Sequence, residues 1–239
     1  MQSRSNLGGF KTPLTAALVA SLVVVCNQSR VVATTPLAQR NADATPIDCD
    51  ELPEPPAWIA ELMRRGDVAL VHGPPDDPRR ISGKRVTAAE TAYEIEFDFR
   101  LRLRWRIDED AIEVFIDDID FQWQPVHTIW FRQLPAAESF WNERLVLHEL
   151  DHVAISSHRS IRDTFQRRAG QLSPLKGEVR AEETPRQAAG RIAREAVKAL
   201  FDDVSNLAKI RYVELDRQTD HGLQPIPAGS ELRPFVGGR

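Results

Sequence analysis

The sequence predicts an α+β domain, in which a small antiparallel β-sheet is followed by two long packed helices. Residues 93–105 alternate apolar and charged side chains, which is the period of two expected of a strand with one buried face. Beyond Pro135 the apolar residues recur at helical spacing instead, first over residues 135–169 and again from Pro185 toward Tyr212. Strand signals that precede helical ones, rather than alternating with them, are typical of α+β folds.

The first 33 residues are expected to form a signal peptide or an N-terminal anchor. An apolar run, LTAALVASLVVVC, occupies residues 14–26 behind the basic Lys11. The run is shorter than the about 20 apolar residues of a membrane-spanning helix, and the small-residue site at residues 31–33 suits a secretory signal. We therefore expect export to the periplasm or the extracellular space. Retention of the leader as an anchor and lipidation of Cys26 are the alternatives.

The remaining composition is that of a soluble globular protein. Of the 239 residues 42% are hydrophobic and 28% are charged, and the net charge of −4 gives no indication of nucleic-acid binding. Residues 34–56 are polar and proline-rich, so we expect a flexible linker that buries too little apolar surface to order. Cys49 is the only cysteine beyond the leader, which excludes an intramolecular disulfide in the mature chain. Residues 225–239 are expected to be an irregular tail.

The folded domain is expected to begin with a short amphipathic helix. Trp58, Ile59, Leu62 and Met63 fall at helical spacing, and Gly66 provides a stop. A strand is expected over residues 68–71, followed by a loop over residues 73–78, where glycine, proline and aspartate cluster.

Two further extended segments are expected after the strand at residues 93–105. Residues 112–123 alternate again, but the phase slips at Asp117-Asp118, which predicts a bulge or a break. A third extended piece covers residues 126–134 and runs up to Pro135. Two or three antiparallel strands are therefore expected before the first helix.

The segment LHELDH, residues 147–152, lies inside the first predicted helix. On a helix, residues four apart share a face, so His148 and His152 can bind one Zn²⁺ ion, as in the zincin-like HExxH pattern. In zinc proteases with this pattern the glutamate, here Glu149, takes a proton from the water that attacks the substrate carbonyl. Glu149 is therefore the candidate catalytic base. The alternative is a helix with two partly exposed histidines and no metal.

The third zinc ligand has three candidates. His158 has the histidine spacing of the metzincins, H-E-x-x-H-x-x-G-x-x-H, but Ile155 stands where those enzymes place a glycine to turn the chain. In an unbroken helix His158 points away from the metal face. His221 and Asp216 follow the second predicted helix, from which a side chain can approach the metal from another direction. We favour His221, with Asp216 as the alternative.

The segment LDRQTDHG at residues 215–222, together with the sheet followed by the HELDH helix, resembles a family of predicted secreted, zinc-dependent bacterial proteases known as a domain of unknown function. Asp216, Thr219, His221 and Gly222 match the family segment, whereas Leu215 stands where its tyrosine would be. The family also has a tryptophan before the HExxH segment.

In this chain that tryptophan is Trp141, and the resemblance extends roughly over residues 79–224. It implies a zinc-peptidase-like domain, which we place at residues 57–224, and outer-shell roles for Asp216 and Thr219 in fixing the ring of His221. Ordinary capping of the helix end is the alternative reading of these two residues.

The predicted function is that of a secreted or envelope zinc-dependent metallopeptidase, with a protein or peptide as substrate. A zinc-binding envelope module without catalysis and a zinc amidase acting on peptidoglycan are the alternatives. Contact with a membrane is expected only through an uncleaved leader. By analogy with other zinc peptidases, an extended substrate is expected to add to residues 126–134 through backbone hydrogen bonds.

Overall fold

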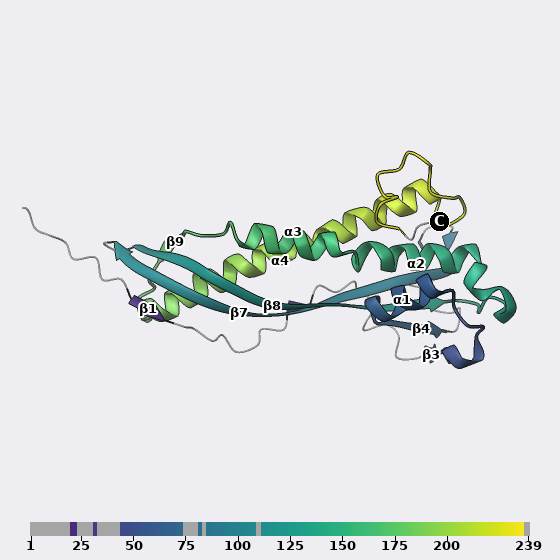
Figure 1. Ribbon diagram of the computed structural model, residues 1–239, viewed down its shortest axis with the longest axis horizontal. Coiled ribbons are helices and arrows are strands. Elements are labelled where there is room, and N and C mark those ends of the chain that lie inside the picture. Colours follow the sequence, from purple (N-terminus) through teal and green to yellow (C-terminus); the bar gives the residue numbers. More distant parts are fainter. Residues whose placement is uncertain are drawn as a thin grey trace, which may run out of the picture.

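The computed structural model describes residues 20–22, 31–32, 44–73, 81–82, 85–108 and 111–236 of the chain. Two long strands form a ribbon along the molecule, and helices run beside it (Figure 1). The helices are α1 (Ala57–Gly66), α2 (Arg144–Ser156), α3 (Arg159–Ala169) and α4 (Pro185–Thr219), with the 3-10 helices η1 (Cys49–Glu51) and η3 (Ala137–Asn142). The strands are β1 (Ala20–Leu22), β2 (Val31–Val32), β3 (Thr45–Pro46), β4 (Val68–His72), β5 (Ile81–Ser82), β6 (Arg85–Val86), β7 (Ala89–Asp108), β8 (Ala111–Phe131) and β9 (Leu175–Glu178).

The α+β class is confirmed, but the main sheet is mixed rather than antiparallel throughout. Its order is β1-β7-β8-β4-β3, with β2 also on β7 and β9 also on β8. The strand expected at residues 68–71 is present as β4, and it lies parallel to residues 127–131 of β8. Alternation in the sequence does not fix the direction of a strand, because the connecting segments decide it.

The antiparallel pair β7 and β8 forms the ribbon. The register shifts between Arg102, opposite Asp118, and Leu103, opposite Ile116, so Asp117 is the extra residue. The bulge predicted at this position is confirmed. The third strand expected over residues 126–134 is wrong as a separate element, because β8 continues through Pro125 to Phe131.

Strand β8 can contain Pro125 because of how its neighbouring strands are arranged. In the part of the chain that the structure describes, β9 covers residues 111–114 of β8 and β4 covers residues 127–131. Pro125 therefore lies in a section that is paired only with β7, and a proline is accepted on such an edge.

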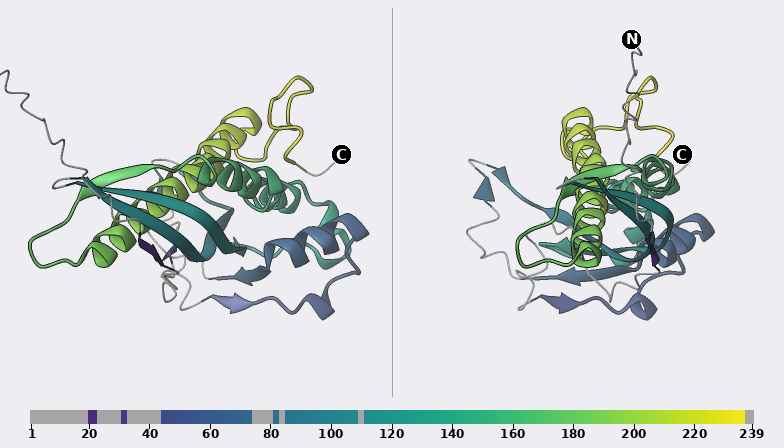
Figure 2. Two further views of the ribbon diagram at one scale, coloured as in Figure 1. Left: turned by 60° about the vertical axis from the view of Figure 1, so that its left-hand side comes forward. Right: turned by 90° about the vertical axis from the view of Figure 1, so that its left-hand side faces the viewer.

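The buried face of β7 is the one predicted from its alternation. Its apolar side chains are all buried, and they pack against α3 and α4: Tyr93, Ile95, Phe97, Phe99, Leu101, Leu103 and Trp105. Phe97 lies at the centre of this core, with its ring centroid 4.6 Å from that of Phe201 on α4 and 4.9 Å from that of Phe165 on α3. A second core joins α1 and α2 to β4 and the end of β8. Figure 2 shows these elements close together at one end of the molecule.

The single helix expected over residues 135–169 is wrong, because η3, α2 and α3 replace it. The helix is interrupted at His158, whose backbone is extended. The side chain of His158 caps α3 by accepting a hydrogen bond from the backbone N–H of Ser160. Apolar spacing does not reveal such a cap. The helix expected from Pro185 is confirmed as α4, which starts with a capping box of Thr184 and Gln187 and extends past Tyr212 to Thr219.

The expected leader lies outside the described residues, apart from residues 20–22 and 31–32, which form β1 and β2 on β7. The loop expected at residues 73–78 is described only at Gly73. Within the described ranges, no helix combines the length and the apolar character needed to cross a membrane.

The described residues of both flanking segments pack against the domain. In the expected linker, Leu52 is buried, and the indole N–H of Trp141 donates a hydrogen bond of 2.6 Å to the carbonyl of Pro53. In the expected tail, residues 225–236 contain no helix or strand, and Leu232 is buried with Ile155 and Leu215. The tail therefore folds back over α2 and α4.

Candidate metal centre

Helices α2 and α4 bring three of the predicted residues together. His148 and His152 lie one turn apart on α2, and Asp216 lies in the last turns of α4. The Nε2 atom of each histidine is 3.1 Å from Oδ1 of Asp216. One carboxylate oxygen thus faces both rings.

These distances fit a zinc site. Ligand atoms about 2.0 Å from a tetrahedral zinc ion lie about 3.3 Å from one another, close to the 3.1 Å separations between the rings and the carboxylate. In the described part of the chain, His148, His152 and Asp216 form the one group of metal-ligating side chains whose ligand atoms all lie within 4.8 Å of one another. The same distances also suit direct hydrogen bonds between the rings and the carboxylate.

The acidic side chains of the cluster shift the pKa values of its members. Burial alone would raise the pKa of Asp216, but the hydrogen bonds from His148 and His152 hold this pKa far below its usual value. Burial likewise would lower the pKa of His152, but Asp216, Glu149 and Asp151 together raise it. Acidic groups therefore surround the rings, a setting in which a bound cation would be stabilised.

The two histidines are oriented in different ways. Nδ1 of His148 lies 3.4 Å from Oγ1 of Thr219, a hydroxyl that also donates to the carbonyl of Leu215. Nδ1 of His152 is buried and has no hydrogen-bond partner among the described residues. A metal-bound histidine usually donates its second N–H to a partner; His152 has instead the contact of Nε2 with Asp216 and the packing of its ring.

The end of α4 lies directly against His148. Asp220, His221 and Gly222 all have positive φ angles, of 49°, 54° and 83°. A Cβ atom on Gly222 would lie 2.8 Å from Cγ of His148 and 2.9 Å from its Cβ. Glycine is needed here both for its backbone conformation and for this close approach.

His221, the favoured third ligand, is not in the three-residue group, and Asp216 takes that place. The side chain of His221 is 62% exposed, and its Nδ1 lies 3.8 Å from Oδ2 of Asp216. The physical reason is the length of α4, which continues to Thr219, so that Asp216 faces α2 and His221 follows the left-handed turn. His221 therefore stands beside the carboxylate rather than against the two rings.

His158 lies away from this centre. Its Nδ1 is 2.8 Å from the hydroxyl of Ser160, and its ring packs edge-on against Phe235. The expectation that it points away from the metal face agrees with this placement, although the helix is broken there rather than continuous.

Glu149 is buried beside the cluster, with 4% of its surface exposed. The hydroxyl of Thr91, on β7, donates a 2.6 Å hydrogen bond to Oε2 of Glu149. Sequence reasoning missed Thr91, although the alternation that buries Tyr93 and Ile95 extends back to it and places it on the same face.

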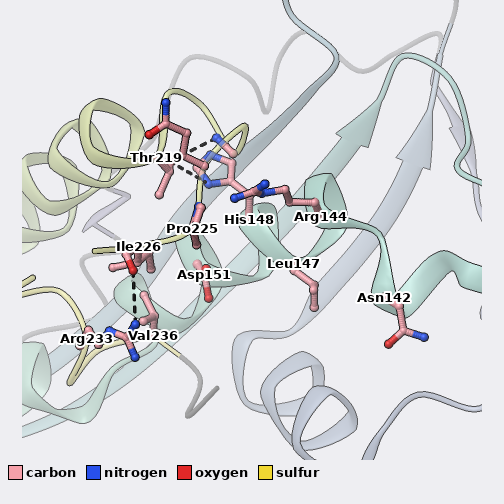
Figure 3. A pocket seen from close by; sticks show the side chains of 12 residues that line it. Asn142, Arg144, Leu147, His148, Asp151, Thr219, Pro225, Ile226, Arg233 and Val236 are labelled. Atoms are coloured by element: carbon pink, nitrogen blue, oxygen red, sulfur yellow. Dashed lines mark hydrogen bonds between the residues drawn. The ribbon is translucent and has the colours of Figure 1, made fainter. Parts of the chain in front are cut away.

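A cavity of about 680 Å³ opens beside His148, between α2 and the C-terminal segment (Figure 3). Leu147, His148 and Asp151 line it from α2, and Ile226 and Val236 line it from the other side. Two arginines also border the cavity: Arg144 and Arg233. Neither Glu149 nor Asp216 belongs to its wall. The cavity therefore gives access to only one side of the cluster.

Comparison of the chain with protein-family models, with curated proteins and with solved structures found no match. The family resemblance of residues 215–222 stays a prediction.

Proposed function

We propose that this protein is a zinc-dependent metallopeptidase in which His148, His152 and Asp216 bind the metal. One observation carries the proposal: the Nε2 atoms of both histidines lie 3.1 Å from one carboxylate oxygen of Asp216. Glu149 lies on the same helix as the two histidines. Two imidazoles and a carboxylate are a common ligand set of catalytic zinc, and they leave a coordination position open.

Zinc at such a site supplies Lewis acidity and makes a nearby water molecule more acidic. Glu149 acts as the base in this proposal. Its Oε2 is engaged by Thr91, which fixes the carboxylate and leaves Oε1 to accept a proton. Nδ1 of His221 lies 3.8 Å from Oδ2 of Asp216, which is beyond direct hydrogen-bond distance, so His221 borders the carboxylate without orienting it.

The cavity beside His148 is the proposed binding site for the substrate. Its walls combine apolar side chains, such as Leu147 and Ile226, with the guanidinium groups of Arg144 and Arg233. Such a mixture suits a peptide, whose side chains and backbone need both kinds of contact. Addition of a substrate strand to residues 127–131 is not proposed, because β7 and β4 already pair with this stretch on its two sides.

A zinc-binding module without catalysis is the second candidate, and one observation favours it. Glu149 is hydrogen-bonded to Thr91 and does not line the cavity, so the cavity does not connect the proposed base with a substrate. Catalytic zinc keeps a coordination position that water or substrate can reach, whereas structural zinc does not.

Metal analysis combined with hydrolysis assays tests the proposal. We expect about one zinc per chain in the wild type, loss of zinc in His148→Ala and Asp216→Ala, and full zinc in the control His158→Ala. Loss of zinc in His221→Ala with retention in Asp216→Ala would instead assign His221 as the third ligand.

Glu149→Gln separates the two candidate functions. We expect this variant to keep its zinc and to lose hydrolysis of casein by about a thousandfold. Wild type that binds zinc and cleaves neither casein nor purified cell wall would identify the non-catalytic module, and cleavage of cell wall alone would identify an amidase.

A further inference from the structure

The ring of Tyr212, on α4, packs against the ring of His152, with the two centroids 4.3 Å apart. His148 is the other ring beside His152, at 4.7 Å. Nδ1 of His152 has no hydrogen-bond partner among the described residues, so these two ring contacts hold its orientation together with the contact of Nε2 with Asp216. Tyr212 is the nearer of the two by centroid distance.

The hydroxyl of Tyr212 is itself held by α2. It lies 2.8 Å from Oγ of Ser156, which is one turn after His152. Tyr212 in turn is one turn before Asp216. The contact between Tyr212 and Ser156 therefore joins the same two helices that bring His152 and Asp216 together, one helical turn away from these two residues.

Ser156 connects this contact to a fully buried histidine of β8. Nε2 of His127 lies 2.5 Å from Oγ of Ser156, and Nδ1 of His127 lies 2.5 Å from the carbonyl oxygen of Gly66. A carbonyl oxygen only accepts, so Nδ1 of His127 carries a proton. Burial lowers the pKa of His127 to about 4, so the ring is neutral near pH 7 and Nε2 accepts.

This tautomer fixes the direction of the hydrogen bonds that link His127, Ser156 and Tyr212. Ser156 has one hydroxyl proton, and Nε2 of His127 at 2.5 Å is closer than the carbonyl oxygens of His152 at 3.1 Å and Val153 at 3.3 Å. Ser156 donates to His127 and accepts from Tyr212. Burial raises the pKa of Tyr212 well above its usual value, which keeps its hydroxyl protonated as the donor.

We propose that Tyr212 is a positioning residue for His152, and that a buried chain of hydrogen bonds through Ser156 and His127 to the carbonyl of Gly66 fixes it in place. The inference rests on the proposed metal site. In that site His148 is oriented by Thr219, whereas His152 is oriented by the ring of Tyr212. These hydrogen bonds join residues of α1, β8, α2 and α4, so they fix the ring of Tyr212 to the core rather than to one helix.

Zinc affinity tests this inference. The zinc dissociation constant is measured by competition with a chelator for the wild type, Tyr212→Phe and Ser156→Ala, with Tyr93→Phe as the matched control. Tyr93 also has a buried hydroxyl and packs on Tyr212, but its hydroxyl bonds to the carbonyl of Ser205. Loss of an outer-shell contact weakens metal binding by about 10- to 100-fold, so we expect about a tenfold loss in the first two variants and none in Tyr93→Phe.

Affinities equal to that of the wild type in both Tyr212→Phe and Ser156→Ala overturn the inference. Tyr212→Phe keeps the ring volume, and Ser156→Ala breaks the same chain should the first variant fail to fold. NMR of the metal-free protein provides a readout that needs no zinc, since the ring-proton shifts of His152 should move in both variants and stay unchanged in Tyr93→Phe. Wild type without zinc affinity would sink the proposed function, while the NMR result would still decide the role of Tyr212.

Discussion

Acidification should destabilise the fold through His127, and the structure gives the size of the effect. His127 is 1% exposed, and both of its ring nitrogens are engaged, by Gly66 and by Ser156. Burial lowers its pKa from 6.5 to about 4 in the folded protein. Between these two pKa values the unfolded chain binds a proton that the folded chain does not, so lowering the pH favours unfolding.

The magnitude follows from the two pKa values. For one group with pKa 6.5 unfolded and about 4 folded, the free energy of unfolding falls by about 2.5 kcal/mol between about pH 7.5 and about pH 4.5. The loss begins as the pH falls below the unfolded value and levels off below the folded one. Other groups also titrate in this range, so the wild type must be compared with a variant that lacks only this group.

His127→Gln is that variant, because glutamine keeps a polar side chain and does not titrate. Unfolding in urea, followed by tryptophan fluorescence in the presence of a chelator, gives the free energy of unfolding of both proteins across the pH range. We expect the advantage of the wild type over His127→Gln to shrink by about 2.5 kcal/mol on acidification. A difference that does not vary with pH would refute the assignment of a neutral, buried His127.

Three further predictions concern the proposed metal site. Gly222→Ala should weaken zinc binding at least about tenfold and cost about 1–2 kcal/mol of stability, because the new Cβ would lie 2.8 Å from Cγ of His148 at a φ of +83°. Chelator competition measures the zinc affinity, and urea unfolding measures the stability. The control Gly229→Ala should change neither, because a Cβ there would have nothing within 4 Å. Thr91→Val should lower peptidase activity about tenfold with zinc content unchanged, since Glu149 loses the donor to Oε2; equal activity would remove Thr91 from the site. Zinc at about 100 times its dissociation constant should stabilise the folded protein by about 2.7 kcal/mol, seen as a rise in Tm that a chelator reverses, and an unchanged Tm would count against binding to the folded state.

The sequence anticipates features that depend on local periodicity. The alternation at residues 93–105 identifies the buried face of β7, and the slip of phase at Asp117 identifies the bulge. The spacing of His148 and His152 places both rings on one side of α2. Each of these depends only on the geometry of one element, which repeats along the chain.

Features that depend on the ends of elements were harder to anticipate. Apolar spacing did not show the break at His158, where a side-chain cap starts a new helix. Apolar spacing also does not show at which residue α4 ends, and for this reason the sequence favours His221 over Asp216 as the third ligand. The positive φ angles at residues 220–222 end the helix after Thr219, and this end determines which side chain faces α2.

The contacts among His127, Ser156 and Tyr212 could not have been anticipated at all. The three residues come from β8, α2 and α4, and no local pattern relates them. Their meeting depends on how α2 crosses α4 above the sheet, which is decided by the packing of both helices on β7 and β8. Polar side chains within an apolar face are the remaining trace of such a network in a sequence.

The burial of α2 is itself an argument for a functional site. His148, Glu149, Asp151 and His152 are each no more than 6% exposed, on a helix whose other buried positions are mostly apolar. Burying ionisable groups costs free energy, and apolar residues of similar volume usually stabilise a fold at least as well as buried charges. Stability alone does not account for four such groups in five successive positions. The proposed cation between α2 and Asp216 would account for the two histidines, because it would replace the water that their rings have lost.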